Sequence, residues 1–256
     1  MLRTRVIPTL LLQEGGLVKG QQFKNHKYVG DPINAVKIFN EKEVDELVFL
    51  DISATQERRE PDYEVIADIA SEAFMPFGYG GGISEVMQIE KLFSLGVEKA
   101  IINSSAFYKP QLIKDAAKVS GSQSVVVSMD VKKSLFGGYE VYVQNGQVKT
   151  KQNPVDYAKK MQDLGAGELI VCAIDREGTA KGYDLKLLDM VSRAVEIPVV
   201  GLGGAGCLQD LADAKNQTAV SGLSAGDMFV FHGKHKAVLI TYPKYSELEA
   251  LLQKGS

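Results

Sequence analysis

The sequence contains no tryptophan, three histidines and only two cysteines among its 256 residues, and its charges nearly cancel. Cys172 and Cys207 lack the spacing of a zinc site, and two cysteines are too few for a disulfide scaffold. The net charge of −3 excludes the basic excess of a general nucleic-acid binder. We therefore expect a reduced, cytoplasmic protein that needs no metal, cofactor or nucleic acid.

Long apolar runs are missing as well. No stretch reaches the roughly 18 apolar residues of a membrane-spanning helix, and the apolar start of the chain carries no A-x-A-like cleavage site for a signal peptide. We expect neither membrane insertion nor secretion. An apolar content of 45% nevertheless excludes a disordered chain, and the length allows one large domain or two small ones.

Short β-branched runs alternate with amphipathic stretches along the whole chain. The expected strands are Arg5–Leu12, Leu47–Asp51, Met75–Gly78, Ala100–Ile102, Val125–Asp130, Leu169–Ala173, Pro198–Gly201 and Met228–Phe231. The expected helices include Pro32–Asn40, Glu85–Leu95, Pro110–Val119, Pro154–Leu164, Leu185–Ala194 and Leu208–Asn216. This rhythm predicts a single α/β domain over residues 1–256, a (β/α)8 TIM barrel. A doubly wound sheet is the alternative, but no G-x-G-x-x-G motif follows the first strand.

An internal repeat supports the barrel. At an offset of 122 residues, Glu46-Leu47 matches Glu168-Leu169, Pro76 matches Pro198, and Gly81-Gly82 matches Gly203-Gly204. Because these matches share one offset and flank strands, they indicate two copies of a half-barrel. Residues 132–152 interrupt the pattern with an alternating segment that predicts a β-hairpin turned at Asn145-Gly146, in the loop after the fifth strand.

Glycines and small polar residues follow four of the expected strands, at the end of a barrel where active sites lie. They are Gly81, Gly82, Asn103 and Ser104 after the third and fourth strands, and Gly178, Thr179, Gly203 and Gly204 after the sixth and seventh. Glycine lets backbone N–H groups approach an anion closely. The sequence therefore predicts two repeat-related phosphate sites. The alternative is that the glycines only turn tight corners between strands and helices.

Three aspartates end strands, and each can act as a general acid or base or can order a loop. We favour chemistry for Asp130 and a structural role for Asp51 and Asp175. His232 and His235 follow the last expected strand, and we expect surface or capping roles for both.

Charged residues stand at the opposite ends of the strands. Arg5, Glu46, Lys99 and Glu168 each lie at the start of a strand, with two of each sign. One interpretation is a ring of salt bridges that closes the bottom of the barrel. The other is a gate that controls passage through it.

Several motifs in series resemble the cyclase subunit (HisF) of imidazole glycerol phosphate synthase. They include RVIPTLLLQEGGLVKG, DELVFLDISA, INSSA, VVVSMDVKK, DREGTAKGYDL and IPVVGLGGAG. The similarity runs from residue 1 to about residue 206 and weakens afterwards. It implies that a HisH-like glutaminase docks on the amino-terminal face of the barrel. Ammonia would then cross the barrel and react with a bis-phosphorylated ribulosyl substrate, yielding imidazole glycerol phosphate and an aminoimidazole carboxamide ribotide.

The resemblance also assigns roles to individual residues. It puts the four charged residues on the ammonia gate, Lys19 on the substrate loop after the first strand, and Asp130 on one of two catalytic aspartates. It puts Gly81, Gly82 and Asn103 on the first phosphate site. The second phosphate site would be formed in part by Gly178, Thr179, Gly203 and Gly204.

Departures from the family pattern concern the cyclase chemistry. Leu11 replaces the second catalytic aspartate, and a leucine cannot transfer a proton. Glu177 stands for the family's acid in the sixth loop, Leu202 replaces a serine, and Cys172 replaces a hydroxyl residue. Apolar bulk is therefore expected at the second phosphate site.

This pattern resembles HisF paralogues of surface-polysaccharide biosynthesis. There the barrel conducts ammonia from the glutaminase to an ATP-dependent sugar amidotransferase that forms an acetamidino group. The closing VLITYPK resembles that subgroup as well. One alternative is a working cyclase, a lyase of histidine biosynthesis. The other is a non-catalytic scaffold that activates the glutaminase.

Overall fold

The computed structural model describes residues 4–134, 137–233 and 237–253, so His235 lies outside the described residues. Parallel strands form a closed ring in the order β10, β11, β12, β1, β4, β5, β6, β7, and β7 pairs with β10. The strands are β1 (Arg5–Gln13), β4 (Leu47–Asp51), β5 (Phe77–Gly80), β6 (Lys99–Ile102), β7 (Val125–Lys133), β10 (Glu168–Ala173), β11 (Val199–Leu202) and β12 (Gly222–Ala225). The predicted (β/α)8 barrel is confirmed.

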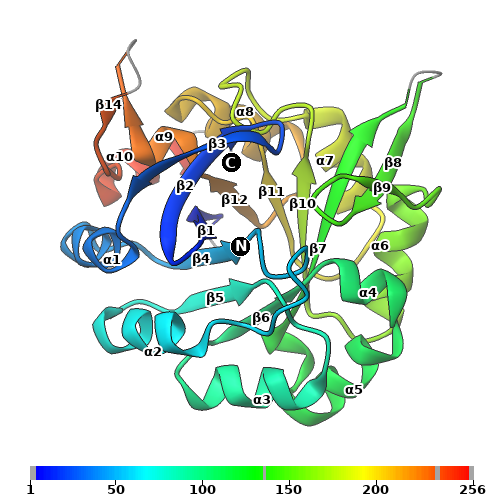
Figure 1. Ribbon diagram of the computed structural model, residues 1–256. Coiled ribbons are helices and arrows are strands. Elements are labelled where there is room, and N and C mark those ends of the chain that lie inside the picture. The colour runs from blue at the N-terminus through cyan, green and yellow to red at the C-terminus, as the bar shows by residue number, and fades with distance from the viewer. Residues whose placement is uncertain (1–3, 135–136, 234–236, 254–256) are drawn as a thin grey trace.

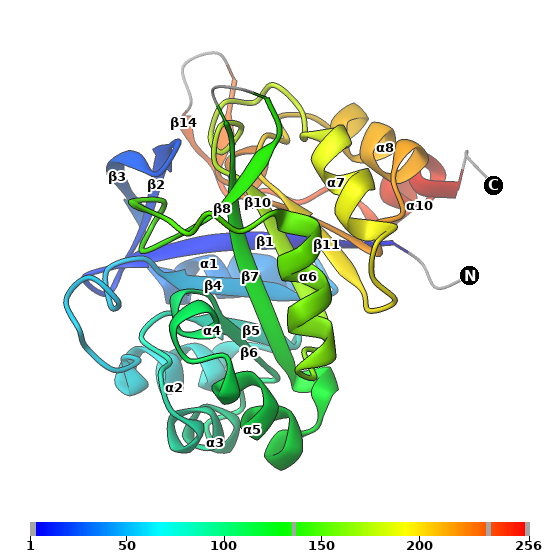
Figure 2. The ribbon, with the colours of Figure 1, turned by 90° about the vertical axis from the view of Figure 1, so that its right-hand side faces the viewer.

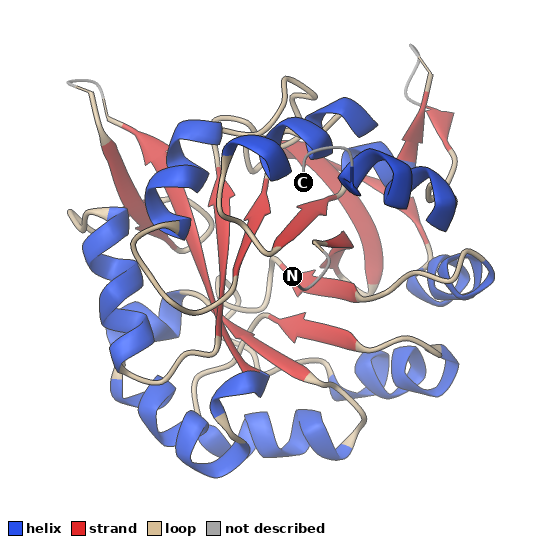
Figure 3. Ribbon diagram, turned by 180° about the vertical axis from the view of Figure 1, so that it is seen from behind, coloured by secondary structure: helices blue, strands red, loops and turns tan. Residues whose placement is uncertain are grey.

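Helices surround this ring on its outer side (Figures 1 and 3). They are α1 (Pro32–Glu41), α2 (Tyr63–Glu72), α3 (Val86–Ser94), α4 (Ser104–Tyr108), α5 (Gln111–Ser120), the 3-10 helix η1 (Ser122–Ser124), α6 (Pro154–Asp163), α7 (Leu185–Ser192), α8 (Leu208–Gln217), α9 (Asp227–Val230) and α10 (Tyr245–Gln253). Asp31 and Asp62 cap α1 and α2, since their carboxylates accept hydrogen bonds from backbone N–H groups in the first turn. Within the described residues, no helix combines the length and apolarity needed to cross a bilayer.

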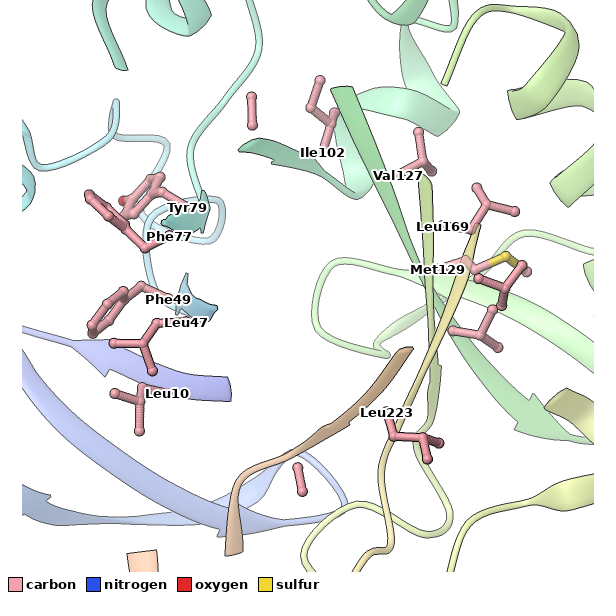
Figure 4. Close-up of a cluster of buried hydrophobic side chains, with 14 of the residues drawn as sticks. Leu10, Leu47, Phe49, Phe77, Tyr79, Ile102, Val127, Met129, Leu169 and Leu223 are labelled. Carbon is pink, nitrogen blue, oxygen red and sulfur yellow. The ribbon is translucent and has the colours of Figure 1, made fainter. Parts of the chain in front are cut away.

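Side chains alternate between the two sides of the barrel wall. Leu47 and Phe49 of β4 point outward, away from the middle of the ring, and are completely buried under the helices (Figure 4). Val48 lies between them in sequence and belongs to a separate cluster inside the barrel. The buried members of that inner cluster are Ile7, Val48, Ile101, Val126, Ile170, Cys172, Val200 and Leu202. The barrel interior is therefore apolar over its middle.

The eighth strand differs from the prediction. We expected it at Met228–Phe231, but β12 is formed by Gly222–Ala225, and Met228 lies in the short helix α9, which begins at Asp227. Gly222 leaves room for a methyl group of Val200, because a Cβ atom there would lie 2.9 Å from it. The hydroxyl of Ser224 donates to the carbonyl of Ile7. A strand of such small residues lacks the β-branched pattern on which the prediction relied.

Two hairpins extend beyond the carboxyl ends of the barrel strands (Figure 2). The hairpin of β8 (Tyr139–Val143) and β9 (Val148–Lys149) confirms the one predicted within residues 132–152, and Asn145 and Gly146 occupy its turn with positive φ angles. The hairpin of β2 (Gly16–Gln21) and β3 (Lys24–Gly30) was not predicted. A separate two-stranded sheet joins β13 (Phe231–His232) and β14 (Ala237–Val238).

The repeated residues lie at equivalent places in the ring. Glu46 immediately precedes β4 and Glu168 begins β10, and these two strands are four positions apart. The pairs Gly81-Gly82 and Gly203-Gly204 likewise follow β5 and β11, again four positions apart. This spacing agrees with the half-barrel repeat.

Replacing Phe49 tests the outer core. Its ring meets that of Phe77 edge to face, with 6.1 Å between the centroids. We expect Phe49→Ala to lower the free energy of unfolding by about 3–5 kcal/mol, because it leaves a cavity between the barrel and its helices. Phe49→Leu should cost about 1–2 kcal/mol. Denaturant unfolding of the two variants measures the difference, and equal losses would contradict this account of the packing.

Candidate functional site

A pocket opens at the carboxyl ends of the barrel strands, and we call it the upper pocket. Asp130 and Leu11 both line it. So do four of the predicted phosphate-binding residues, Gly81, Gly82, Asn103 and Ser104. Apolar side chains complete its floor and walls, among them Leu50, Ile101, Cys172 and Leu202. The structure therefore gathers the first predicted phosphate site and the predicted acid around one space.

Asp130 lies in β7 and is buried in this pocket. Burial raises the pKa of its carboxyl group to about 7, and the negative charge of Glu177 adds to the rise. The side-chain amide of Asn103, which donates to Asp130 Oδ2 over 3.0 Å, acts in the opposite direction. A carboxyl group with such a pKa can accept or donate a proton near neutral pH. Leu11 contributes only apolar surface to the same pocket.

The first glycine pair is also required by backbone packing. A Cβ atom on Gly81 would lie 2.5 Å from the carbonyl oxygen of Asp51, and one on Gly82 would lie 2.6 Å from that of Arg59. Asp51 itself orders this loop, because its carboxylate accepts from the N–H of Ser53 over 2.9 Å and pairs with Arg59 at 3.0 Å. The structural role expected of Asp51 agrees with these contacts. Gly81 and Gly82 thus combine a packing role with a place on the pocket wall.

The second set of predicted phosphate-binding residues lies elsewhere. Gly178, Thr179, Gly203 and Gly204 are not among the residues that line the upper pocket. A Cβ atom on Gly178 would collide with the carbonyl of Gly20 in the β2–β3 hairpin, and one on Gly204 would collide with that of Gly182. The hydroxyl of Thr179 donates to the carbonyl of Arg176 within its own turn. Tight packing between loops accounts for these residues in the structure.

A buried cluster of charges occupies the barrel end near β10 and β12. Lys19 lies in β2, and its side chain is only 2% exposed. Its ammonium group is 3.7 Å from Glu177 Oε1 and 4.0 Å from Asp227 Oδ1. Burial raises the pKa of Glu177, although Lys19 lowers it. Gly226 makes room for this ammonium group, because any Cβ atom there would overlap it.

Both hairpins dock onto the loops around the pocket. Gln22 at the tip of the β2–β3 hairpin donates its N–H to the carbonyl of Glu177 over 2.9 Å. The N–H of Gln144, in the β8–β9 turn, donates to the hydroxyl of Ser104 over 3.0 Å. Asp175 accepts from the N–H of Lys133 over 2.8 Å, which agrees with its expected structural role. The pocket is therefore bordered by segments that are fixed from both halves of the barrel.

Four charged residues form a closed ring at the amino ends of the strands, which we call the charge ring. Arg5 lies 2.6 Å from both Glu46 and Glu168, and Lys99 lies 2.6 Å from Glu46 and 2.8 Å from Glu168. Each cation thus contacts both carboxylates. A lower cavity sits on this ring, lined by three of its members and by inner apolar residues, including Ile101. Ile101 lines both the lower cavity and the upper pocket.

Two site residues escaped the sequence-based predictions. Asp227 was not predicted because the eighth strand was assigned to residues that follow it in the sequence. His26 lines the pocket from the unpredicted β3, where burial lowers its pKa and Lys19 lowers it further. His232 is exposed, as expected, and Cys172 is buried in the inner apolar cluster. Among the described residues, no group of three or more His, Cys, Asp or Glu side chains is arranged to hold a metal.

Comparison with known proteins gives consistent results. The family described as "Histidine biosynthesis protein" matches residues 5–236. The chain is 51% identical to the putative imidazole glycerol phosphate synthase subunit hisF2 of Pseudomonas aeruginosa, covering 97% of this chain and 99% of that protein. It is 49% identical to the putative HisF subunit of Leptospira interrogans, covering 98% and 99%. It is 41% identical to the imidazole glycerol phosphate synthase subunit HisF of Alkaliphilus metalliredigens, covering 91% and 92%.

The raised pKa of Asp130 predicts a pH-dependent stability. Above the ordinary pKa of 3.8 the unfolded chain loses this proton, whereas the folded protein keeps it until about pH 7. Stability should therefore fall as the pH rises through this window. We expect wild type to lose about 3 kcal/mol more than Asp130→Asn between pH 5 and pH 8, measured by denaturant unfolding. Parallel pH profiles of the two proteins would contradict the raised pKa.

Proposed function

Because the chain belongs to the histidine biosynthesis protein family, we propose that it is the barrel subunit of a glutamine amidotransferase complex of the imidazole glycerol phosphate synthase type. In this complex a HisH-like glutaminase docks on the amino-terminal face and releases ammonia there. The ammonia crosses the barrel and is used on the opposite face. The observation that carries this proposal is the charge ring with an apolar interior directly above it.

The barrel interior suits a small neutral molecule. Beyond the charge ring, the lower cavity is walled mainly by inner aliphatic residues, and Ile101 lines both this cavity and the upper pocket. Ammonia is uncharged and crosses apolar surroundings at a low free-energy cost. An ion would lose its hydration shell there, and the apolar walls would offer no polar groups to replace it. The charge ring is neutral as a whole, because two cations face two carboxylates. If the Lys99 side chain moved aside, the ring would open while its other three members stayed in contact.

The amino-terminal face also carries apolar residues suited to a docked protein. Phe74 is 88% exposed and precedes β5 by three residues, and Val119 is 54% exposed in the last turn of α5. Both lie shortly before the start of a strand. They are therefore on the amino-terminal face of the barrel, where the charge ring also lies. Exposed aromatic side chains are common anchors of protein interfaces. We assign this surface to the glutaminase.

The comparisons favour cyclisation as the fate of the ammonia. Curated relatives are named as subunits of imidazole glycerol phosphate synthase. In this reaction Asp130 would transfer protons at neutral pH, and Gly81, Gly82, Asn103 and Ser104 would bind a phosphate group of the substrate. Cyclisation would then proceed without a carboxylate at position 11, because Leu11 lines the pocket there.

Sugar amidation is the second candidate, and Leu11 favours it. Without a carboxylate at position 11, proton transfer in cyclisation should be slower by orders of magnitude. The barrel would then deliver ammonia to an ATP-dependent sugar amidotransferase, which forms the acetamidino group. A cyclase assay with ammonium and the bis-phosphorylated ribulosyl substrate separates the candidates. Turnover by the wild type supports cyclisation. If the wild type shows no turnover but still transfers ammonia, the result supports amidation.

Leu11→Asp tests the missing acid directly. In the cyclase assay we expect this variant to exceed the wild type by about 100-fold, because a second carboxylate then faces the substrate beside Asp130. Leu11→Asn is the matched control, since it is polar and similar in size but cannot donate or accept the proton. Equal rates for the two variants would contradict the role given to this position.

Lys99→Met tests conduction through the charge ring. We expect the transfer of glutamine-derived ammonia to fall about tenfold while the glutaminase continues to hydrolyse glutamine. Lys99→Arg keeps the positive charge and is the control. The ratio of transferred ammonia to hydrolysed glutamine is the quantity to measure. An unchanged ratio in Lys99→Met would exclude a conduit and favour a scaffold.

Phe74→Asp tests the docking surface. We expect it to weaken binding of the HisH-like glutaminase at least about tenfold, measured by isothermal titration. Met87→Asp is the control, because Met87 is 72% exposed but lies in the first turn of α3, beyond the carboxyl end of β5. If both variants bind equally well, the partner does not dock where we propose.

A further inference from the structure

Two buried hydroxyl groups lie inside the barrel, where the lower cavity and the upper pocket approach each other. Ser224 lines the lower cavity, and Thr9 lines the upper pocket. A hydrogen bond joins their side-chain oxygens, and the two residues are only 1% and 2% exposed. We call them the hydroxyl pair. Because its members line different spaces, the pair provides a polar contact point between one space and the other.

Both hydroxyl hydrogens of the pair are used within the protein. A hydroxyl group has one hydrogen to donate and two lone pairs that accept. Ser224 donates its hydrogen to the carbonyl of Ile7 over 2.8 Å, so the hydrogen bond between Ser224 and Thr9 is donated by Thr9. In the part of the chain that the structure describes, no group donates to Thr9 Oγ1. The hydroxyl pair therefore has lone pairs that can accept a hydrogen bond and no hydrogen left to donate.

The hydroxyl pair is not needed to hold its two strands together. β1 and β12 are already joined by a parallel ladder that ends with Pro8 opposite Ala225. Tyr183 also fixes β12, because its hydroxyl donates to the carbonyl of Ser224 over 2.9 Å. Of the described residues that line the lower cavity, the other uncharged ones are all aliphatic. Buried hydroxyl groups carry a desolvation cost that aliphatic residues avoid, so packing alone does not account for the pair.

Ammonia fits this arrangement of acceptors. A molecule that enters the lower cavity loses its hydrogen bonds to water, and aliphatic walls offer none in return. Ammonia donates hydrogen bonds through its N–H groups, and the lone pairs of the hydroxyl pair can accept them. An ammonium ion is served less well, because neither hydroxyl carries the negative charge that would balance a buried cation. The pair therefore suits the neutral molecule.

We propose that the hydroxyl pair is a binding site for neutral ammonia between the charge ring and the upper pocket. Ammonia that has passed the charge ring donates a hydrogen bond to Ser224 in the lower cavity and then to Thr9 in the upper pocket. No covalent bond forms or breaks in this step. The inference rests on the proposed conduction of ammonia through the barrel, and it assigns residues to the part of the passage that lies beyond the charge ring.

Thr9→Val tests the inference in the complex with the glutaminase, because valine keeps the shape of threonine and lacks its hydroxyl group. We expect the ratio of transferred ammonia to hydrolysed glutamine to fall about fivefold, since one hydrogen bond to the passing molecule is lost. Thr9→Ser keeps the hydroxyl group and is the matched control, with a ratio close to that of the wild type. Ser224→Ala should also lower the ratio and provides a second variant if Thr9→Val does not fold.

Ammonium supplied in solution separates conduction from an effect on the upper pocket, because this ammonia reaches the pocket without crossing the barrel. With saturating ammonium, we expect Thr9→Val to form the product of the ammonia-consuming reaction at the wild-type rate. An equal loss with either ammonia source would overturn the inference, since the hydroxyl would then serve the upper pocket itself.

The Lys99 variants separate this inference from the proposed function. If Lys99→Met lowers the transfer ratio while folded Thr9→Val and Ser224→Ala leave it unchanged, the inference is overturned and conduction through the charge ring stands. If none of the three variants changes the ratio, the barrel is not a conduit, and both proposals are wrong.

Discussion

Closure of the parallel ladder between β7 and β10 is the constraint on which the rest of the structure depends. A closed ring of strands has an inside and an outside, and alternation sends successive side chains to each. Closure also brings the carboxyl ends of strands from both halves of the chain onto one rim. Asp130, Asn103 and Leu11 meet there although they are far apart in sequence. The opposite rim gathers the charge ring by the same geometry.

The two ends of the barrel bury charge in different ways. In the charge ring, two cations and two carboxylates alternate, so every charged group contacts two of opposite sign. At the other end a single cation, Lys19, faces Glu177 and Asp227. Burial of such groups is costly unless they are paired. In the charge ring each ion pair is shared among four groups, whereas Lys19 lies between two carboxylates and lies farther from each of them.

The sequence allowed the fold to be predicted far better than the site. Alternating β-branched runs and repeat-related motifs were enough for the barrel, because they reflect local rules of strand formation. The position of β12 was not predicted, because Gly222 and Ser224 have low strand propensity and instead fit closely against their neighbours. The two glycine pairs have equal local patterns in the sequence, but they have different surroundings in the structure. Only long-range packing distinguishes them, since Gly204 meets the loop at Gly182 whereas Gly81 faces the pocket. The burial of Lys19 depends in the same way on a hairpin with a polar sequence.

Ile101 belongs to the wall of the upper pocket and to the wall of the lower cavity. One side chain thus contributes to the walls of two spaces that lie at opposite ends of the barrel interior. A change of this side chain that altered the shape of the upper pocket would also alter the shape of the lower cavity. In evolutionary terms, the two faces of the barrel cannot be optimised independently at this position. New substrates are more easily accommodated at Leu11 or Leu202, which border the pocket and leave the lower cavity unchanged.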